Sequence, residues 1–198
     1  MAERPRWNGN LHALAPLLRT IPSGARRGLD VGCGEGETAR RLRTRVVEVV
    51  GIDPDEPSIL EARSYDDDIR YEVSDLESAT FEPRSFDVVT AVASLHHMDH
   101  DAALARLASF VAPGGVLLVV GLARSRTPMH YGRDAIDAVA VRRHILLRGA
   151  WETPAPKTWP APMTYTEARD RAEALLPGVA YRRVPHFRYT LRWVAPAT

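Results

Sequence analysis

Short apolar runs alternate with amphipathic stretches along the first part of the chain. Several runs are rows of Val and Leu without a clean two-residue alternation, which is typical of strands buried on both faces. We expect strands at Arg27–Val31, Val46–Ile52, Ile69–Val73, Phe86–Ala93 and Val116–Gly121. Helices are expected between them at Glu37–Arg43, Pro57–Ser64 and Asp101–Val111. Alternating strands and helices predict an α/β fold, with a parallel sheet covered by helices on both sides.

The regular alternation stops after Gly121. Residues 124–131 predict a loop, whereas Arg133–Leu147 carries apolar residues at helical spacing. Four prolines between residues 150 and 162 predict an irregular covering segment.

The last third of the chain predicts one more helix and two strands. Thr164 and Glu167 have the spacing of a capping box, and the helix that follows is expected to end at Pro177 and Gly178. The closing strands are expected at Val179–Pro185 and Phe187–Val194. Because they follow one another directly, they predict an antiparallel edge on an otherwise parallel sheet.

A glycine-rich turn follows the first expected strand. Asp30, Gly32, Gly34 and Gly36 form the pattern Asp-x-Gly-x-Gly-x-Gly directly before the helix expected at Glu37. Glycine tolerates positive φ and has no Cβ, so such a loop lets the backbone approach a ligand closely, and the helix amides then point at that ligand. The dinucleotide fingerprint fits less well because the third glycine comes one residue early, and no Lys-Ser/Thr pair marks a P-loop. A tight turn without a ligand remains an alternative.

Composition narrows the class of protein. A chain of 198 residues, 45% hydrophobic and 26% charged, predicts one globular domain. The net charge of +1 gives no reason to expect a nucleic-acid or membrane partner. The single cysteine excludes an intrachain disulfide, and no apolar run reaches the length of a signal or membrane segment. We therefore expect a cytoplasmic protein.

Two later segments extend the pattern of the glycine loop. Phe86–Ala93 and the stretch from Leu107 through Pro113, Gly114 and Gly115 come in the same order and spacing as in one family. On these residues the chain resembles class I S-adenosylmethionine (SAM) dependent methyltransferases, most closely the small type-11 or UbiE-like group. The resemblance is strongest over residues 26–122. It implies a Rossmann-like doubly wound sheet of strand order 3-2-1-4-5-7-6 with a small helical lid, and SAM as the cofactor.

The resemblance also implies a set of cofactor-binding positions. The glycine loop would hold the methionine and ribose portions, Asp53 the ribose hydroxyls, Asp75 and the Leu76 amide the adenine, and the Ala93 carbonyl the methionine amino group. The expected cofactor-binding residues are Asp30, Gly32, Cys33, Gly34, Gly36, Asp53, Pro54, Asp75, Leu76 and Ala93. Two alternatives stay open: Asp53 as the cap of the next helix, followed by Pro54 in its first turn, and Asp75 as an Asx-turn residue.

Three histidines and two aspartates gather between residues 96 and 101. Such a cluster can bind zinc, and it matches half of a metallo-hydrolase motif, but the remaining ligands are missing. We therefore expect no metal. A helix-entry loop in which His96 and His100 are solvated is an alternative. The resemblance places His97 at the end of the fourth strand, where a neutral imidazole can accept a proton from the substrate.

The acceptor of the methyl group is the least determined feature. Residues 1–25 and 124–163 are expected as lids over a single domain, and plain packing of their aromatic residues is the alternative. The expected substrate-binding residues are Trp7, His12, His96, Tyr131 and Trp159. The overall prediction is a SAM-dependent methyltransferase acting on an O, N or C atom of a small molecule. A non-catalytic SAM-binding scaffold, and less favoured a metal-dependent hydrolase, remain as alternatives; the oligomeric state stays open.

Overall fold

The computed structural model describes residues 8–65, 68–126, 128–149, 161–185 and 187–197. In chain order the elements are α1 (Gly9–Leu18), β1 (Arg27–Val31), α2 (Glu37–Arg43), β2 (Glu48–Asp53), α3 (Glu56–Arg63), β3 (Arg70–Val73), β4 (Phe86–Val92), the 3₁₀ turn η1 (Leu95–His97), α4 (His100–Phe110), β5 (Val111–Leu122), α5 (Pro128–Arg148), α6 (Tyr165–Leu175), β6 (Ala180–Val184) and β7 (Arg188–Val194).

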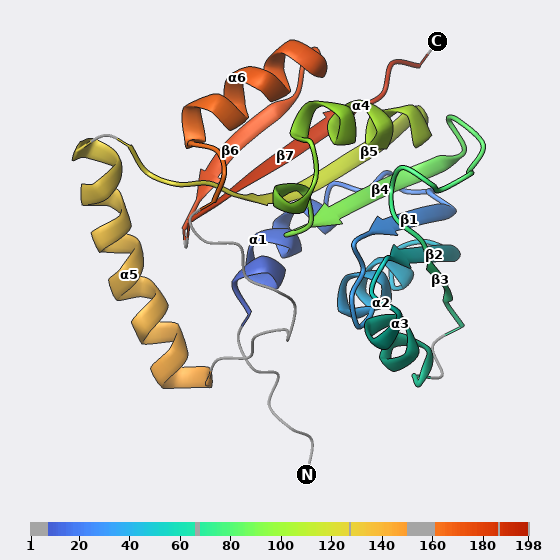
Figure 1. Cartoon of the computed structure of the whole chain (residues 1–198), viewed down its shortest axis with the longest axis horizontal. Coiled ribbons are helices and arrows are strands. Elements are labelled where there is room, and N and C mark those ends of the chain that lie inside the picture. The colour runs from blue at the N-terminus through green and yellow to red at the C-terminus, as the bar shows by residue number, and fades with distance from the viewer. Residues whose placement is uncertain (1–7, 66–67, 127, 150–160, 186, 198) are drawn as a thin grey trace.

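Seven strands form one twisted sheet of order β3-β2-β1-β4-β5-β7-β6 (Figure 1). The first five strands pair in parallel, and β7 pairs antiparallel with both β5 and β6. The predicted α/β class, the strand order and the antiparallel edge are therefore confirmed. Because the parallel strands end at one edge, the loops that follow β1, β2 and β4 come together there.

The apolar runs are buried on both faces of the sheet, as the lack of alternation predicted. In β5, Leu117 and Val119 enter the core beneath α4 and α6. Their neighbours Leu118 and Val120 enter the second core, beneath α1, α2 and α3. Successive strand residues point to opposite faces, so an uninterrupted apolar run serves both cores.

The helix α1 was not predicted. Asn8 caps it by accepting hydrogen bonds from the Asn10 and Leu11 amides at 2.9 and 3.3 Å. Its apolar residues, Leu14 and Leu17 among them, are buried against the sheet. Part of the segment expected as an N-terminal lid is thus a structural helix, and its polar start lies at the carboxyl edge, where the Arg188 Nε donates to Asn10 Oδ1 at 2.6 Å.

Two expected boundaries were wrong. Residues 124–131 were expected as a loop, yet α5 begins at Pro128, because proline is well suited to the first turn of a helix. The fifth strand was expected to begin after the Pro-Gly-Gly break, but β5 begins at Val111. Val111 pairs with Phe86 and Val116 with Val88, so the break is an irregularity within one strand.

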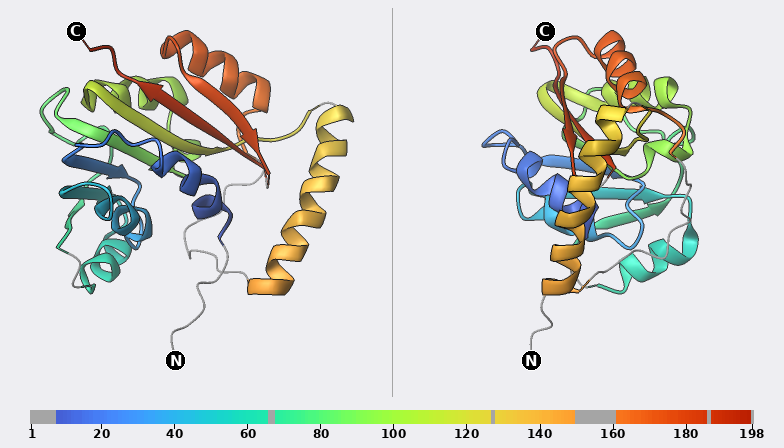
Figure 2. Two further views of the ribbon diagram at one scale, coloured as in Figure 1. Left: turned by 180° about the vertical axis from the view of Figure 1, so that it is seen from behind. Right: turned by 90° about the vertical axis from the view of Figure 1, so that its left-hand side faces the viewer.

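The helix α5 extends away from the body on the side of β6 and β7 (Figure 2). Arg183 of β6 holds it near its start, with its Nη2 at 2.6 Å from Asp134 Oδ1 and at 3.3 Å from the His130 carbonyl oxygen. No helix in the described residues is long and apolar enough to span a membrane.

Candidate functional site

The glycine turn after β1 is fastened to β2 and to the turn after β4. The amides of Gly32 and Cys33 both donate to the Ile52 carbonyl, at 2.8 and 3.0 Å. Gly32 has φ +72°, and a Cβ there would lie 2.4 Å from the Ser94 Cβ. Any side chain at Gly32 would therefore push the first and fourth strand ends apart.

Asp53 links the end of β2 to this turn. Its Oδ2 accepts from the Gly34 amide at 2.9 Å, and its Oδ1 accepts from the Asp55 amide at 2.9 Å. The expectation that Asp53 caps the next helix is wrong: Asp55 is the cap, accepting from the Ser58 amide at 3.0 Å, and Pro57, not Pro54, lies in the first turn. A carboxylate has about four lone-pair sites, so half-buried Asp53 keeps capacity for further donors.

The turn leaves open space in front of Gly34. This residue has φ +51°, and a Cβ built on it would meet nothing within 4 Å. Gly36, with φ +83°, is the N-cap of α2, and as a glycine it offers no side-chain cap to the amides of that helix end. A half-buried turn with an open face, followed directly by a helix start whose cap residue is a glycine, is a suitable cradle for a polar ligand.

Ala93 turns the chain sharply where β4 ends. It has φ +54°, a strained conformation for a residue with a Cβ. Its amide donates to the Val120 carbonyl at 2.8 Å, and the next residue, Ser94, donates its hydroxyl to the Val31 carbonyl at 3.0 Å. The tertiary structure thus holds Ala93 in this conformation beside the glycine turn.

Asp30 is buried beneath the turn, at the end of β1. Its Oδ1 accepts from the Thr90 hydroxyl at 2.8 Å, and its Oδ2 is buried without a hydrogen-bond partner in the described part of the chain. Burial raises the pKa of Asp30 to about 7, the Asp53 charge adds to this, and the Thr90 hydrogen bond opposes it. Thr90 and Ser94 were not predicted as site residues; the signal available was a hydroxyl inside or directly after an apolar strand.

A measurable pH dependence follows from Asp30. Its pKa is about 7 in the folded chain against 3.8 for the ordinary group, so the folded chain binds more protons between those values. The free energy of unfolding should therefore fall as the pH rises from about 4 to about 7. We expect Asp30→Asn to reduce this fall by roughly 1 kcal/mol or more, since one pKa unit corresponds to about 1.4 kcal/mol.

Urea unfolding at pH 5, 6, 7 and 8 measures this slope. Exposed Asp68 provides the matched control, and Asp68→Asn should retain the wild-type profile. An Asp30→Asn profile as steep as the wild type would show that Asp30 does not cause the dependence.

Cys33 lies within the turn as a buried thiol. Burial, together with the charges of Asp30 and Asp53, holds the pKa of this thiol far above its usual range. A thiol that stays protonated is a poor nucleophile. Cys33 thus contributes backbone and volume, and its amide is already bonded to Ile52.

The loop after β3 contains the Asx-turn at Asp75 that was predicted from the sequence as an alternative. The Asp75 Oδ1 accepts from the Ser78 amide at 2.7 Å and from the Ser78 hydroxyl at 2.6 Å. These bonds lower the pKa of the Asp75 carboxyl, which is exposed. Leu76 turns its side chain into the core. The Asx-turn is therefore present. Both of its hydrogen bonds from Ser78 go to the Oδ1 oxygen of Asp75.

The histidine segment follows Ser94 directly. Leu95 is buried in the core, His96 is half-buried and His97 is exposed, with their ring centroids 3.9 Å apart. Burial, and then the neighbouring His97, lower the pKa of His96 to about 4. The two histidines follow Ser94 by two and three residues, and Ser94 contacts Gly32 of the glycine turn.

The other members of this cluster have structural partners. Asp99 caps α4 by accepting from the Ala102 amide at 2.9 Å. Asp101 pairs with Arg171 of α6 at 2.9 Å and with the His100 Nδ1 at 3.0 Å. The alternative of a solvated His100 is wrong: His100 is buried, because it begins α4 and faces the core side of that helix.

Among the described residues, no three His, Cys, Asp or Glu side chains gather in a way that could hold a metal ion. We therefore predict no stoichiometric zinc and unchanged activity after treatment with a chelator. Elemental analysis of the purified protein measures this directly. About one zinc per chain, the occupancy of a genuine catalytic site, would contradict the prediction.

The expected substrate-binding residues are only partly described. Trp7 and Trp159 lie outside the described residues. His12 on α1 and Tyr131 on α5 are exposed and come from the two segments that border the carboxyl edge. His96 is the third described member of the set. The structure thus arranges these residues around one edge without bringing them into a single cluster.

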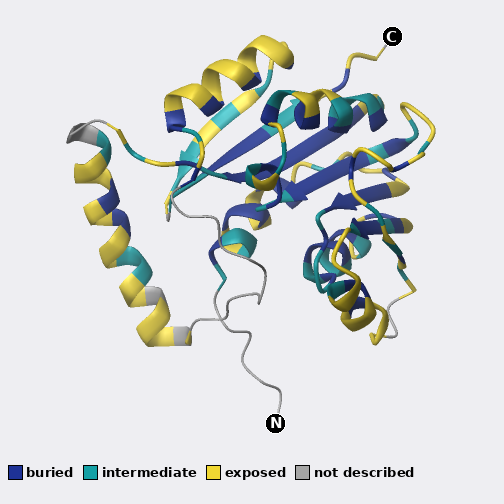
Figure 3. Cartoon of the chain, in the orientation of Figure 1, coloured by how far each residue is buried: buried dark blue, intermediate teal, exposed yellow. Residues whose placement is uncertain are grey.

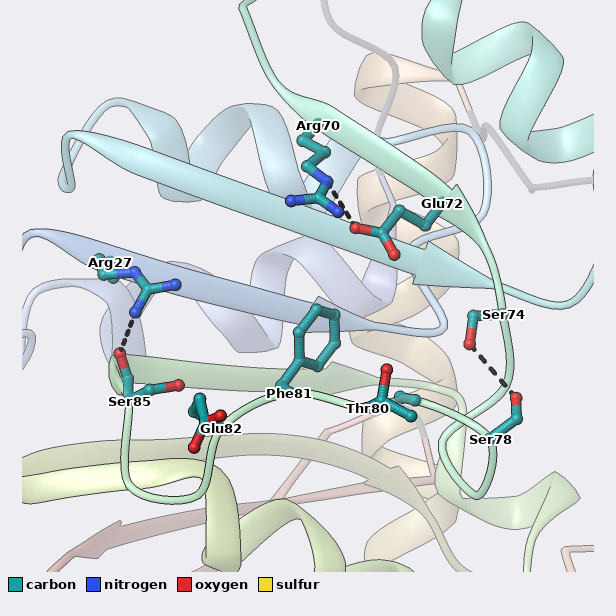
Figure 4. A pocket seen from close by; sticks show the side chains of 10 residues that line it. Arg27, Arg70, Glu72, Ser74, Ser78, Thr80, Phe81, Glu82 and Ser85 are labelled. Carbon is teal, nitrogen blue, oxygen red and sulfur yellow. Dashed lines mark hydrogen bonds and ion pairs between the residues drawn. The ribbon is translucent and has the colours of Figure 1, made fainter.

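A cavity of about 330 Å³ lies elsewhere, beneath the loop that joins β3 to β4 (Figure 4). Arg27, Arg70, Glu72 and Phe81 line it, together with serines of that loop. The Arg70 Nε lies 2.6 Å from Glu72 Oε1, so the opposite charges of these two cavity-lining side chains compensate each other. None of the predicted site residues lines this cavity, and we assign the site to the carboxyl edge instead.

The chain is similar to known proteins over most of its length. A family model for the type-11 methyltransferase domain matches residues 29–119. An uncharacterised methyltransferase of Mycobacterium tuberculosis is 38% identical over 195 residues, 96% of this chain and 98% of the relative. The SAM-bound amino pentose methyltransferase of calicheamicin biosynthesis from Micromonospora echinaspora is 26% identical, with a TM-score of 0.51 over 62% of this chain and 53% of its own. A Pyrococcus horikoshii protein, 19% identical, shares the fold with a TM-score of 0.65 over 93% and 89% of the two chains.

Proposed function

Because this chain belongs to the class I SAM-dependent methyltransferases, we propose that it transfers the SAM methyl group to an O, N or C atom of a small molecule. The observation that carries the proposal is the meeting of three strand ends. The Asp53 carboxylate, the open face of Gly34 and the strained turn at Ala93 lie at the carboxyl ends of β2, β1 and β4. Ligands of open α/β sheets bind at this edge.

The residues at this edge fit SAM. Asp53 is oriented by two backbone amides and retains lone pairs for ribose hydroxyls. The open space at Gly34 admits a ligand against the backbone, and Asp30 lies beneath it as a proton-holding carboxyl. The cradle that these residues form would also involve Gly32, Cys33, Gly36 and Pro54, with Asp75 and Leu76 at the adenine end.

When bound, SAM supplies an activated methyl group that needs no further activation by the protein. The chain contributes alignment of the acceptor with that methyl group and exclusion of water. The carbonyl of Ala93 is assigned to the methionine amino group, because the positive φ reorients the backbone at that residue. His97, exposed beside the same turn, is assigned to the acceptor, where its imidazole takes up a proton.

Two segments border the acceptor space in this proposal. The N-terminal segment up to residue 25 supplies the start of α1, and residues 124–163 supply α5. Arg183 fixes α5 through the ion pair with Asp134, so the lid is anchored at its N-terminal end. We propose that the chain is one domain with these two lids, and that His12, His96 and Tyr131 face the acceptor. We propose a cytoplasmic location, because the single cysteine gives the chain no intrachain disulfide that an oxidising compartment would form.

Cofactor choice is the first test of this function. Calorimetry should give micromolar affinity for SAM and for its demethylated product, and no measurable heat with NAD at the same concentrations. The physical reason is the spacing of the turn, which lacks the third glycine position of a dinucleotide fold. Tighter binding of NAD than of SAM would contradict the proposed function.

A further inference from the structure

The helix α5 buries its acidic side and exposes its aliphatic side. Its two carboxylates, Asp134 and Asp137, are 9% and 8% exposed. On other sides of the same helix, Ile136 and Val139 are each 71% exposed, Leu146 is 77% and Leu147 is 67%. A helix on the surface of a globular protein normally shows the opposite arrangement. In Figure 3 the exposed residues follow α5 along the side that faces away from the sheet.

The exposed charges on this helix are all positive. Ile136, Val139, Arg143 and Leu146 are three or four residues apart, so they lie along one stripe. Arg142 flanks the stripe, and both arginines are exposed without an ion pair in the described part of the chain. We call Ile136, Val139, Arg142, Arg143, Leu146 and Leu147 the α5 outer face.

An occupant of this face has to be both apolar and anionic. A second copy of the chain would bring Arg143 against the same cationic face, with no exposed carboxylate on α5 to compensate. An acceptor in the site would lie on the opposite side, where Asp134 and Arg183 meet. An anionic bilayer meets both requirements, because acyl chains receive aliphatic side chains while acidic headgroups receive arginines.

We propose that the α5 outer face adsorbs to an anionic lipid surface as an interfacial helix that does not cross it. This departs from the expectation of no membrane partner. The net charge of +1 does not exclude this local surface, because acids elsewhere in the chain offset the arginines of α5.

Vesicle flotation of the full chain tests the proposal. The wild type should float with phosphatidylglycerol–phosphatidylcholine vesicles and at least tenfold less with pure phosphatidylcholine vesicles. High salt should weaken the binding because it screens the arginines. The double variant Val139→Glu, Leu146→Glu should bind the anionic vesicles at least tenfold more weakly. The matched control is Val47→Glu, Leu60→Glu, at two positions 55% and 59% exposed outside α5, and it should bind like the wild type.

Circular dichroism and thermal unfolding establish that each variant is folded before it is compared. Failure of the wild type to bind anionic vesicles, equal binding to neutral ones, or an equal loss in the control variant would each overturn the proposal. Wild-type binding to soluble polyglutamate without vesicle binding would assign the face to an acidic protein. A dimer that the Val139→Glu, Leu146→Glu variant dissociates, again without vesicle binding, would assign it to a second copy. None of these measurements depends on SAM.

Discussion

Replacing His97 with alanine should lower the turnover number by roughly 10²–10⁴-fold while the affinity for SAM stays nearly unchanged, if the imidazole acts as a general base. The reason is its position: Ser94 contacts Gly32 of the glycine turn, Leu95 is buried in the core, and the exposed imidazole follows two residues later. The measurement needs an acceptor, which a screen of metabolites with labelled SAM can supply. Turnover and Michaelis constant are then compared for wild type and variant.

His96 provides the control for this prediction. Burial and the neighbouring imidazole lower its pKa to about 4, so it is neutral at physiological pH but too weak a base to serve there. His96→Ala should therefore reduce turnover far less than His97→Ala. A loss confined to the Michaelis constant of the acceptor would make His97 an orienting residue. If neither constant changes, His97 has no role in the reaction, and the rate depends on alignment alone.

Replacing Asp53 with asparagine should weaken SAM binding by roughly 1.5–3 kcal/mol, about 10- to 150-fold, the range expected for charge-assisted hydrogen bonds. The carboxylate is held by the Gly34 and Asp55 amides, and an asparagine can present an acceptor to only one of them. Calorimetry with SAM measures the effect, and urea unfolding checks that the variant is folded.

Asp55, two residues further along the chain, is the matched control, since it is also an aspartate but caps a helix. It caps α3 through the amide and the hydroxyl of Ser58, at 3.0 and 2.6 Å. Asp55→Ala should cost about 1 kcal/mol of stability, the usual effect of losing a cap, with little change in SAM affinity. Unchanged SAM affinity in a folded Asp53→Asn variant would exclude the ribose role.

The strands and helices of the central sheet were predictable because the pattern of apolar residues and glycines within each segment indicates its secondary structure. β1 and α2 have the predicted bounds, since an apolar run ends in glycines and a helix-forming stretch follows. The strand order was available only through resemblance to a family, because periodicity does not specify which strands pair. α1 was missed because Gly9 and Pro16 are poor helix formers, and its stability comes from burying Leu14 and Leu17 against the sheet.

The site was predictable only in part, for a related reason. Asp53 was identified correctly as the end of β2, but only Asp53 was considered as the cap of the next helix, whereas Asp55 is the cap, because the position of a cap depends on backbone angles. The pairing of Thr90 with Asp30 joins residues 60 positions apart, so no local pattern contains it. The inverted exposure of α5 has no signal in the helix itself, because the partner of the buried Asp134 is Arg183, 49 positions away in the chain.

The buried thiol of Cys33 has a practical consequence for spectroscopy. It is the single cysteine of the chain, and burial and two neighbouring carboxyls keep it protonated. A maleimide dye should therefore react with Cys33 only slowly. A fluorophore can then be attached to a cysteine introduced at Val139 without removing Cys33. Since the thiol belongs to the turn itself, the slow rate at which it does react would report how often that turn opens.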